Sequence, residues 1–195
     1  MTFHVERDDS VDIQHAVVKY HYLHRWPHPM SLPFGYRLIR DGVPTAPDGR
    51  PWGVVVMKKP QQLRHSGLFG YDGLPTHWQV LDLARVWIHP ALQGKRADGH
   101  AECVFSQMVG LVMRRVQRDW LEHHPPVYPD LPYQIATVIS YCELEHHDGT
   151  AYRASGFRRV GMSSDGYKEV YVRELRQPKK AWRSTQSVMF DEVTA

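Results

Sequence analysis

Residues 88–101, IHPALQGKRADGHA, join two segments of different periodicity and decide the kind of fold. The preceding run, residues 78–89, is apolar and long enough for a central β-strand. In the following run, residues 102–120, apolar side chains recur at spacings of three and four, as on one face of a helix. These side chains are Phe105, Val109, Val112, Val116 and Trp120. The junction is either a phosphate-binding loop, since free N–H groups at a helix start attract anions, or a capped surface turn.

Outward from this junction, strands and helices alternate. A first helix is expected from Ser10 to near Trp26, where Pro27 follows. Its buried face carries Ile13, Val17, Tyr20 and His24. Strands are expected at residues 3–6, 34–39, 52–57 and 133–141, a short helix at 150–154, and a terminal hairpin of residues 158–162 and 167–175. This order predicts one α/β domain over residues 1–176 and a flexible tail, residues 177–195, without periodicity.

The composition, 42% hydrophobic and 23% charged, is that of a soluble globular protein. No apolar run approaches the ~18 residues of a membrane span, and acids in the opening MTFHVERDDS argue against a signal peptide. We therefore expect a cytoplasmic protein with no membrane partner. The two cysteines, Cys103 and Cys142, are too few for a disulfide framework and are expected to be buried.

The net charge of +3 is unevenly distributed. Residues 153–183 contain nine bases and three acids, so this segment carries six excess positive charges and the remainder is acidic. Such a segment can follow a phosphate backbone, although a solvated surface is the commoner explanation. The first explanation predicts DNA as a partner, bound through Arg153, Arg158, Arg159 and Lys168.

The order of elements, together with AYRASGFRRVG at residues 151–161, resembles the acyl-CoA N-acyltransferase (GNAT) superfamily over residues 1–176. The resemblance implies a mixed, mostly antiparallel central sheet with helices on both faces and a splay between strands 4 and 5. It also implies acetyl-CoA or another acyl donor, with Tyr152 as general acid toward the CoA thiolate. Residues implied to bind the donor are Val86 and Ile88 of the strand and Arg96, Gly99, His100 and Ala101 of the loop.

The loop fits the GNAT pattern in two registers. That pattern is Arg or Gln, two residues, Gly, one residue, then Gly or Ala, and residues 96–101 match it after a loop three residues longer than usual. The usual distance from Pro90 selects Gln93 instead and puts Arg96 and Asp98 at the small-residue positions. Either register places the Asp98 carboxylate near the pyrophosphate, so we expect CoA binding to be weak or absent.

Four blocks resemble the phage Mom proteins, a divergent branch of the same superfamily that converts adenine in DNA to N6-carbamoylmethyladenine. They are HYLHRWP at residues 21–27, LARVW at 83–87, SYCE at 140–143 and HDGTAYRASGF at 147–157. The Mom group typically lacks the glycine-rich CoA loop, in keeping with the poor fit of the loop here. Two features depart from the Mom pattern: Cys142 and Glu143 follow Tyr141 where it has Ala and Asp, and the spacer before the fifth strand is long and proline-rich.

Arg85 is the first candidate catalytic residue. It lies inside an apolar strand, where strict alternation places it on the same face as Leu83 and Trp87. A buried guanidinium is costly unless it meets a carboxylate or a phosphate. It therefore either binds substrate or donor, or forms a structural ion pair with Asp82 or Glu143.

The other candidates lie at the ends of elements. His21 and Tyr22 close the first helix, and two adjacent proton carriers suit acid–base work on an amine. Tyr141 and Glu143 end the fifth strand, where a carboxylate can take a proton from an attacking amine. Ordinary packing and a solvated strand end are the structural alternatives. His21, Tyr22 and Tyr141 are also the candidate ligands of an iron or other metal site.

Three functional hypotheses follow. The first is a Mom-like transferase that flips an adenine from DNA and modifies its N6 amine with a group from a small-molecule donor. The second is an acetyl-CoA-dependent N-acetyltransferase for a small amine or a protein. The third is a non-catalytic nucleic-acid-binding domain. The sequence leaves the donor and the oligomeric state open.

Overall fold

The computed structural model describes residues 2–60, 79–94, 103–124, 135–163 and 165–175. They form one seven-stranded sheet in the order β1-β2-β3-β4-β5-β7-β6. The strands are β1 (Phe3–Arg7), β2 (Phe34–Arg40), β3 (Gly53–Lys58), β4 (Val80–Ile88), β5 (Thr137–Glu143), β6 (Arg158–Met162) and β7 (Lys168–Glu174). Neighbouring strands are antiparallel except β4 and β5, which run parallel. The predicted mixed, mostly antiparallel sheet is confirmed.

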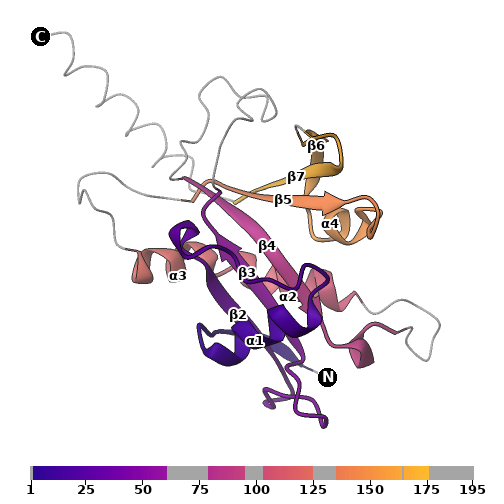
Figure 1. The fold of residues 1–195 in the computed structure, drawn as a ribbon. Coiled ribbons are helices and arrows are strands. Elements are labelled where there is room, and N and C mark those ends of the chain that lie inside the picture. The colour runs from indigo at the N-terminus through magenta and orange to yellow at the C-terminus, as the bar shows by residue number, and fades with distance from the viewer. Residues whose placement is uncertain (1, 61–78, 95–102, 125–134, 164, 176–195) are drawn as a thin grey trace, which may run out of the picture.

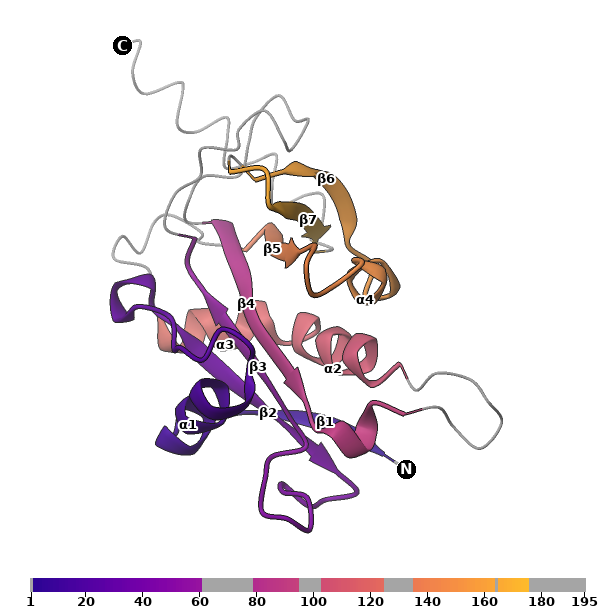
Figure 2. The same cartoon turned by 45° about the vertical axis from the view of Figure 1, so that its right-hand side comes forward.

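Helices cover both faces of the sheet, as predicted (Figures 1 and 2). α1 (Val11–Tyr20) packs against β2, β3 and β4 on one face, whereas α2 (Val104–Met113) packs on the other. α3 (Val116–His123) continues from α2, and the short α4 (Thr150–Ala154) contacts α2 and β6. In the part of the chain that is described, no helix is long and apolar enough to cross a membrane.

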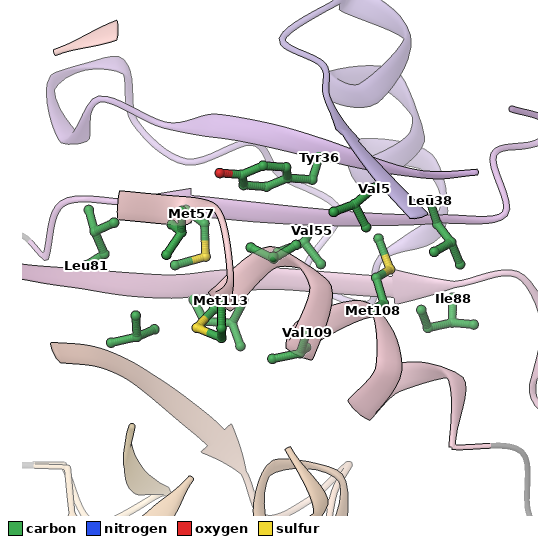
Figure 3. Close-up of a cluster of buried hydrophobic side chains, with 14 of the residues drawn as sticks. Val5, Tyr36, Leu38, Val55, Met57, Leu81, Ile88, Met108, Val109 and Met113 are labelled. Atoms are coloured by element: carbon green, nitrogen blue, oxygen red, sulfur yellow. The ribbon is translucent and has the colours of Figure 1, made fainter. Parts of the chain in front are cut away.

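The core explains why β3 reads as an uninterrupted apolar run. Val55 and Met57 face α2 and belong to the larger cluster shown in Figure 3, with Met108 among its members. Val54 and Val56 face the other way, into the cluster beneath α1. A strand covered on both faces buries its side chains, so β3 is apolar up to Met57 and shows no polar alternation before Lys58, which is partly exposed.

The predicted splay between strands 4 and 5 is confirmed. β4 and β5 pair at only three positions, the last of which joins Asp82 to Ile139. Beyond this point β4 continues to Ile88 along β3, while β5 continues to Glu143 along β7. The two strands therefore separate and leave a cleft that opens toward their C-terminal ends.

The helix predicted over residues 102–120 is in fact two helices. α2 ends at Met113 and α3 begins at Val116, because Arg115 leaves the helical conformation, with φ −123°. Its guanidinium donates to the Val5 carbonyl oxygen at 2.6 Å and pairs with Asp119 at 2.5 Å. The first contact joins the break between α2 and α3 to β1. Helical periodicity cannot predict such a long-range interaction.

Two further expectations were wrong. α1 ends at Tyr20, not near Trp26, since His21 adopts an extended conformation, and His24 is exposed with φ 45°. Residues 21–26 consequently form a segment outside the helix, close to the cleft. Cys142 is buried as expected, but Cys103 is exposed at the start of α2.

Candidate active site between β4 and β5

A cavity of about 340 Å³ lies at the splay. Its walls come from five separate parts of the chain: the segment after α1, the end of β3, the middle of β4, the end of β5 and the β6–β7 hairpin. Four of the six predicted catalytic residues line it, namely Tyr22, Arg85, Tyr141 and Glu143. Lys168, predicted for nucleic-acid binding, also lines it.

A β-bulge in β4 determines where Arg85 lies. Arg85 pairs with Val56, and the register then shifts so that Ala84 has no partner on β3. The extra residue resets the alternation: Leu83 packs in the core beneath α2, whereas Arg85 lies on the α1 face with Trp87. The expected shared face of Arg85 and Leu83 is therefore wrong, and that of Arg85 and Trp87 is right.

Arg85 is half-buried and is held by backbone oxygens. Its Nη1 donates to the Ala84 carbonyl at 2.6 Å and its Nε to the Arg25 carbonyl at 3.4 Å. No carboxylate of the described residues lies within ion-pairing distance of its guanidinium. The structural ion pair with Asp82 or Glu143 is thus not formed. Burial lowers the pKa of the guanidinium, and the nearby Asp82 opposes this effect.

Asp82 and Lys58 form an ion pair on the cavity wall that sequence analysis did not assign to the site. Asp82 Oδ2 lies 3.1 Å from Lys58 Nζ, and the Asp82 side chain is only 7% exposed. Burial raises the pKa of this carboxyl, and Lys58 opposes the rise. Asp82 stands in an apolar strand and Lys58 at the end of another, and sequence alone gives no sign that they are cross-strand partners.

Glu143 forms the second ion pair of the cavity. Its Oε1 lies 2.6 Å from Lys168 Nζ, and the two residues are cross-strand partners in β5 and β7. Hydrogen bonding from Lys168 lowers the pKa of the Glu143 carboxyl. Burial and the neighbouring Glu143 charge raise the pKa of Tyr22 to about 12, so its hydroxyl remains protonated at neutral pH. The ionised Glu143 carboxylate, a proton acceptor, thus lies near the protonated Tyr22 hydroxyl, a hydrogen-bond donor.

His21 contacts Tyr22 but does not line the cavity. The two rings stack with centroids 4.4 Å apart, and the rings of His146 and His147 also pack against Tyr22. Burial, followed by the charge of Arg85, lowers the pKa of His21 to about 4, so the imidazole is neutral at pH 7. Its Nδ1 accepts a hydrogen bond from the Leu23 amide.

The metal site stays a prediction. Tyr22 and Tyr141 both line the cavity, and burial raises the pKa of Tyr141 to about 12. Across the described ranges, no group of three or more His, Cys, Asp or Glu side chains is arranged to hold a metal ion. A site built from His21, Tyr22 and Tyr141 would need two phenolates, and the raised pKa values of both tyrosines oppose their formation.

The remaining candidates lie away from the cavity. Tyr152 stacks on Tyr171, with ring centroids 5.2 Å apart, and burial raises its pKa. It also packs edge-on against Phe157, at 6.0 Å. The side chains of Val86 and Ile88 pack in the core beneath α2. Arg96, Gly99, His100 and Ala101 lie outside the described residues.

The bases predicted to bind nucleic acid each have a partner in the fold. Arg158 pairs with Glu174 at 3.4 Å and Arg159 with Glu169 at 2.5 Å, while Lys168 pairs with Glu143. Arg153 donates to the Tyr171 hydroxyl. The described residues 153–174 contain five bases and three acids, so most of the excess charge of this segment belongs to residues beyond 175.

Comparison with known proteins places this geometry in a familiar fold. No protein-family model and no curated sequence matches the chain. Among solved structures, Arabidopsis thaliana NAA60 in complex with acetyl-CoA has a TM-score of 0.52 and 12% identity, over 89% of this chain and 99% of that one. The aminoglycoside N-acetyltransferase AAC(6')-Ib11 has a TM-score of 0.48 and 12% identity, over 93% and 99%. The likeness to NAA60, together with the mixed sheet and its parallel β4–β5 pair, shows a GNAT-like fold. At 12% identity this likeness shows the fold alone.

Proposed function

We propose that the chain is an acyl-transferring enzyme whose amine acceptor binds in the cavity between β4 and β5. The observation that carries this proposal is the convergence of Tyr22, Arg85, Tyr141 and Glu143 on one cavity at the splay of a GNAT-like sheet. These residues come from three segments far apart in sequence. Polar and titratable groups gathered in a cleft are the usual sign of a reactive site.

The arrangement suits amide formation from a thioester. The amine lone pair attacks the thioester carbonyl carbon, the C–S bond breaks with its electrons leaving on sulfur, and the amine proton passes to a base. Glu143 is suited to accept that proton because Lys168 keeps it ionised. The Tyr22 hydroxyl remains protonated at neutral pH and can donate a hydrogen bond to the departing thiolate, which takes its proton from solvent. Beyond Asp82, β4 has no strand pairing with β5, so this side of the cleft is open to a thioester donor. The Asp98 carboxylate predicts that a CoA thioester binds weakly, so the transfer assay needs a high donor concentration.

The test is transfer from radiolabelled acetyl-CoA to a panel of acceptors: a polyamine, free amino acids, a lysine-rich peptide and duplex DNA. We expect label on at least one acceptor, with a loss of at least tenfold in Glu143→Gln. Arg118→Gln, an exposed change on α3, should retain activity. The proposal fails if no acceptor is labelled, or if Glu143→Gln transfers as fast as the wild type.

A second candidate is the Mom-like modification of adenine in DNA. Three of the four Mom-like blocks, residues 21–27, 83–87 and 140–143, each supply wall residues of the same cavity. N6 of adenine is stacked and paired in a duplex, so the base would have to be flipped into the cavity. Mass spectrometry of nucleosides from the DNA of expressing cells tests this candidate: a new adenine derivative supports it, and unmodified DNA contradicts it.

A further inference from the structure

The cavity lining carries four bases and three acids, namely Arg25, Lys58, Arg85 and Lys168 against Asp82, Glu143 and Asp165. Asp165 accepts hydrogen bonds from the Ser163 hydroxyl and the Tyr167 amide and forms no ion pair among the described residues. Lys58 is neutralised by Asp82 at 3.1 Å and Lys168 by Glu143 at 2.6 Å. Arg85 lines the same cavity, and within the described part of the chain no carboxylate lies within 4 Å of it. Both acids close to Arg85 are thus already engaged with lysines.

Arg25 adds a second such charge. It is exposed, lines the cavity, and forms no ion pair among the described residues. Its carbonyl oxygen accepts the hydrogen bond from Arg85 Nε, so the two residues are adjacent in space. Two guanidinium groups therefore line the same cavity, and neither is paired with a carboxylate of the described residues. Besides burial, the positive charge of Arg25 lowers the pKa of Arg85, and an anion bound between the two groups would relieve this repulsion.

The orientation of Arg85 is fixed by the backbone rather than by a charge. Its Nε and Nη1 donate to the carbonyls of Arg25 and Ala84, and the bulge at Ala84 turns the residue to the cavity side of the sheet. No hydrogen bond joins Nη2 to any described residue, although a guanidinium has five N–H donors. A guanidinium that is held in place and keeps free N–H donors can bind two oxygens of one anion.

We propose that Arg85, assisted by Arg25, forms an oxyanion-binding subsite, and that the molecule bound in this cavity carries a carboxylate or phosphate group. This deepens the proposed function by naming the class of acceptor: an amine that carries an acidic group. The acidic group has two sources, the carboxylate of an amino acid or the phosphate of a nucleotide. The identity of the bound molecule as the acceptor rests on the proposed function. The binding of an anion does not, because it is measured without turnover.

Two pairs of probes that differ in one anionic group test the subsite on the full chain by calorimetry at constant ionic strength. N-acetylglycine is compared with its neutral amide, and adenosine 5′-monophosphate with adenosine. We expect the anionic member of at least one pair to bind the wild type at least tenfold more tightly than its neutral partner. The winning pair identifies carboxylate or phosphate as the source.

Variants assign the discrimination to the arginines. Arg85→Gln should abolish it, and Arg85→Lys should retain only part, because lysine keeps the charge but loses the fork. Arg25→Gln should weaken it less, since Arg25 is exposed, and Arg118→Gln should not change it. Equal binding of the anionic and neutral members in both pairs, or discrimination that persists in Arg85→Gln, would overturn the subsite. Either result leaves the transfer assay to judge the proposed function separately.

Discussion

Lys168 Nζ lies 2.6 Å from Glu143 Oε1, and this cross-strand ion pair joins the β6–β7 hairpin to the end of β5 beside the cavity. Lys168, one of the bases predicted to bind nucleic acid, therefore pairs with Glu143, the carboxylate predicted to act in catalysis. The same pair fixes the position of Glu143 and keeps it ionised.

Replacing Lys168 by Met should raise the pKa of Glu143 toward its ordinary value of 4.5. A lowered carboxyl pKa stabilises the fold above the unfolded-state pKa, and this stabilisation disappears as the pH falls through the folded-state pKa. Lys168→Met should therefore be less stable than the wild type at pH 7 and nearly equal to it near pH 2. Urea unfolding at both pH values and a carbon-13 titration of the Glu143 carboxyl measure the change.

Arg158→Met is the matched control. Arg158 pairs with Glu174 on the same hairpin, but both side chains are at least half exposed and neither lines the cavity. Its loss should leave the Glu143 titration where it is in the wild type. A Glu143 titration that is the same in Lys168→Met and the wild type would contradict the role of the ion pair.

Lys58→Met should destabilise the fold far more than Arg85→Ala. Loss of Lys58 leaves Asp82 buried without its partner, and breaking a buried pair in this way costs about 3–5 kcal/mol. Arg85 has no carboxylate partner among the described residues, so its loss should change the free energy of unfolding by about 1 kcal/mol or less while abolishing transfer activity. Denaturant unfolding of the two variants at pH 7 checks the difference.

The pH dependence of Lys58→Met gives a second check. Burial raises the folded-state pKa of Asp82 above its ordinary value of 3.8. The folded chain therefore holds this proton more tightly than the unfolded chain does, and the fold loses stability as the pH rises from 3.8 through the folded-state pKa. Without Lys58 that pKa rises further, so the deficit of the variant should be large at pH 7 and shrink toward pH 4. Adding Asp82→Asn to Lys58→Met should recover stability at pH 7. A loss of several kcal/mol of stability in Arg85→Ala would contradict this comparison and would mean that Arg85 stabilises the fold.

Periodicity predicted the strands and helices of this fold well, because the spacing of apolar side chains within a segment largely determines whether it forms a strand or a helix. The apolar run before residue 88 became β4 and the hairpin after Phe157 became β6 and β7. The splay and the mixed, mostly antiparallel sheet were predicted from a resemblance, not from the residues themselves. Where the prediction failed, at Arg115 and at His21, the cause is a contact or conformation that departs from the local pattern.

The site was only partly predictable, and the reason is the bulge. Sequence alternation assumes a regular strand, whereas one extra residue at Ala84 reverses which side chains after Leu83 face the cavity. Charged residues in apolar segments pointed to Arg85. The same signal was present at Asp82, inside the same strand, and could have assigned it to the site as well. Its partner Lys58 needed the register of β3 against β4.

For the DNA-modifying candidate, changing Arg158, Arg159 and Lys168 together to Ala should flatten the salt dependence of duplex binding. Each neutralised phosphate contributes a log–log slope of about −0.9, so loss of three contacts changes the slope by up to about 2.7. Their glutamate partners compete with phosphate, which predicts a change below this limit. Fluorescence anisotropy across a salt series measures the slope; an unchanged slope would remove the three bases from the interface.

Changing His21 to Asn should reduce the loss of stability on acidification. The folded-state pKa of about 4 lies below the ordinary 6.5, so the unfolded chain binds the proton first and stability falls as the pH drops from 6.5 to 4. Asparagine removes the titration while its side-chain oxygen can still accept from the Leu23 amide. Urea unfolding between pH 4.5 and 7.5 compares the slopes, with the exposed His15→Asn on α1 as control. Parallel slopes for His21→Asn and the wild type would refute the prediction.

Two glycines with nearly the same backbone conformation provide the last prediction. Gly149, before α4, has φ +74° and Gly166, in the β6–β7 turn, has φ +75°. An added Cβ would meet nothing within 4 Å at Gly166 but would overlap the Tyr171 hydroxyl at Gly149, at 1.9 Å. That hydroxyl donates to Glu169 and accepts from Arg153, so it cannot move without breaking both contacts.

Gly166→Ala should therefore cost only the left-handed backbone conformation, about 1–2 kcal/mol, and Gly149→Ala that amount plus displacement of Tyr171. In a chain of this size each kcal/mol lowers the melting temperature by about 2–4 °C, so calorimetry resolves the two variants. Gly149→Ala should also disturb the stacking of Tyr152 on Tyr171, which near-ultraviolet circular dichroism detects. Equal melting temperatures and unchanged aromatic spectra would mean that Tyr171 moves aside at no cost and does not hold α4 in place.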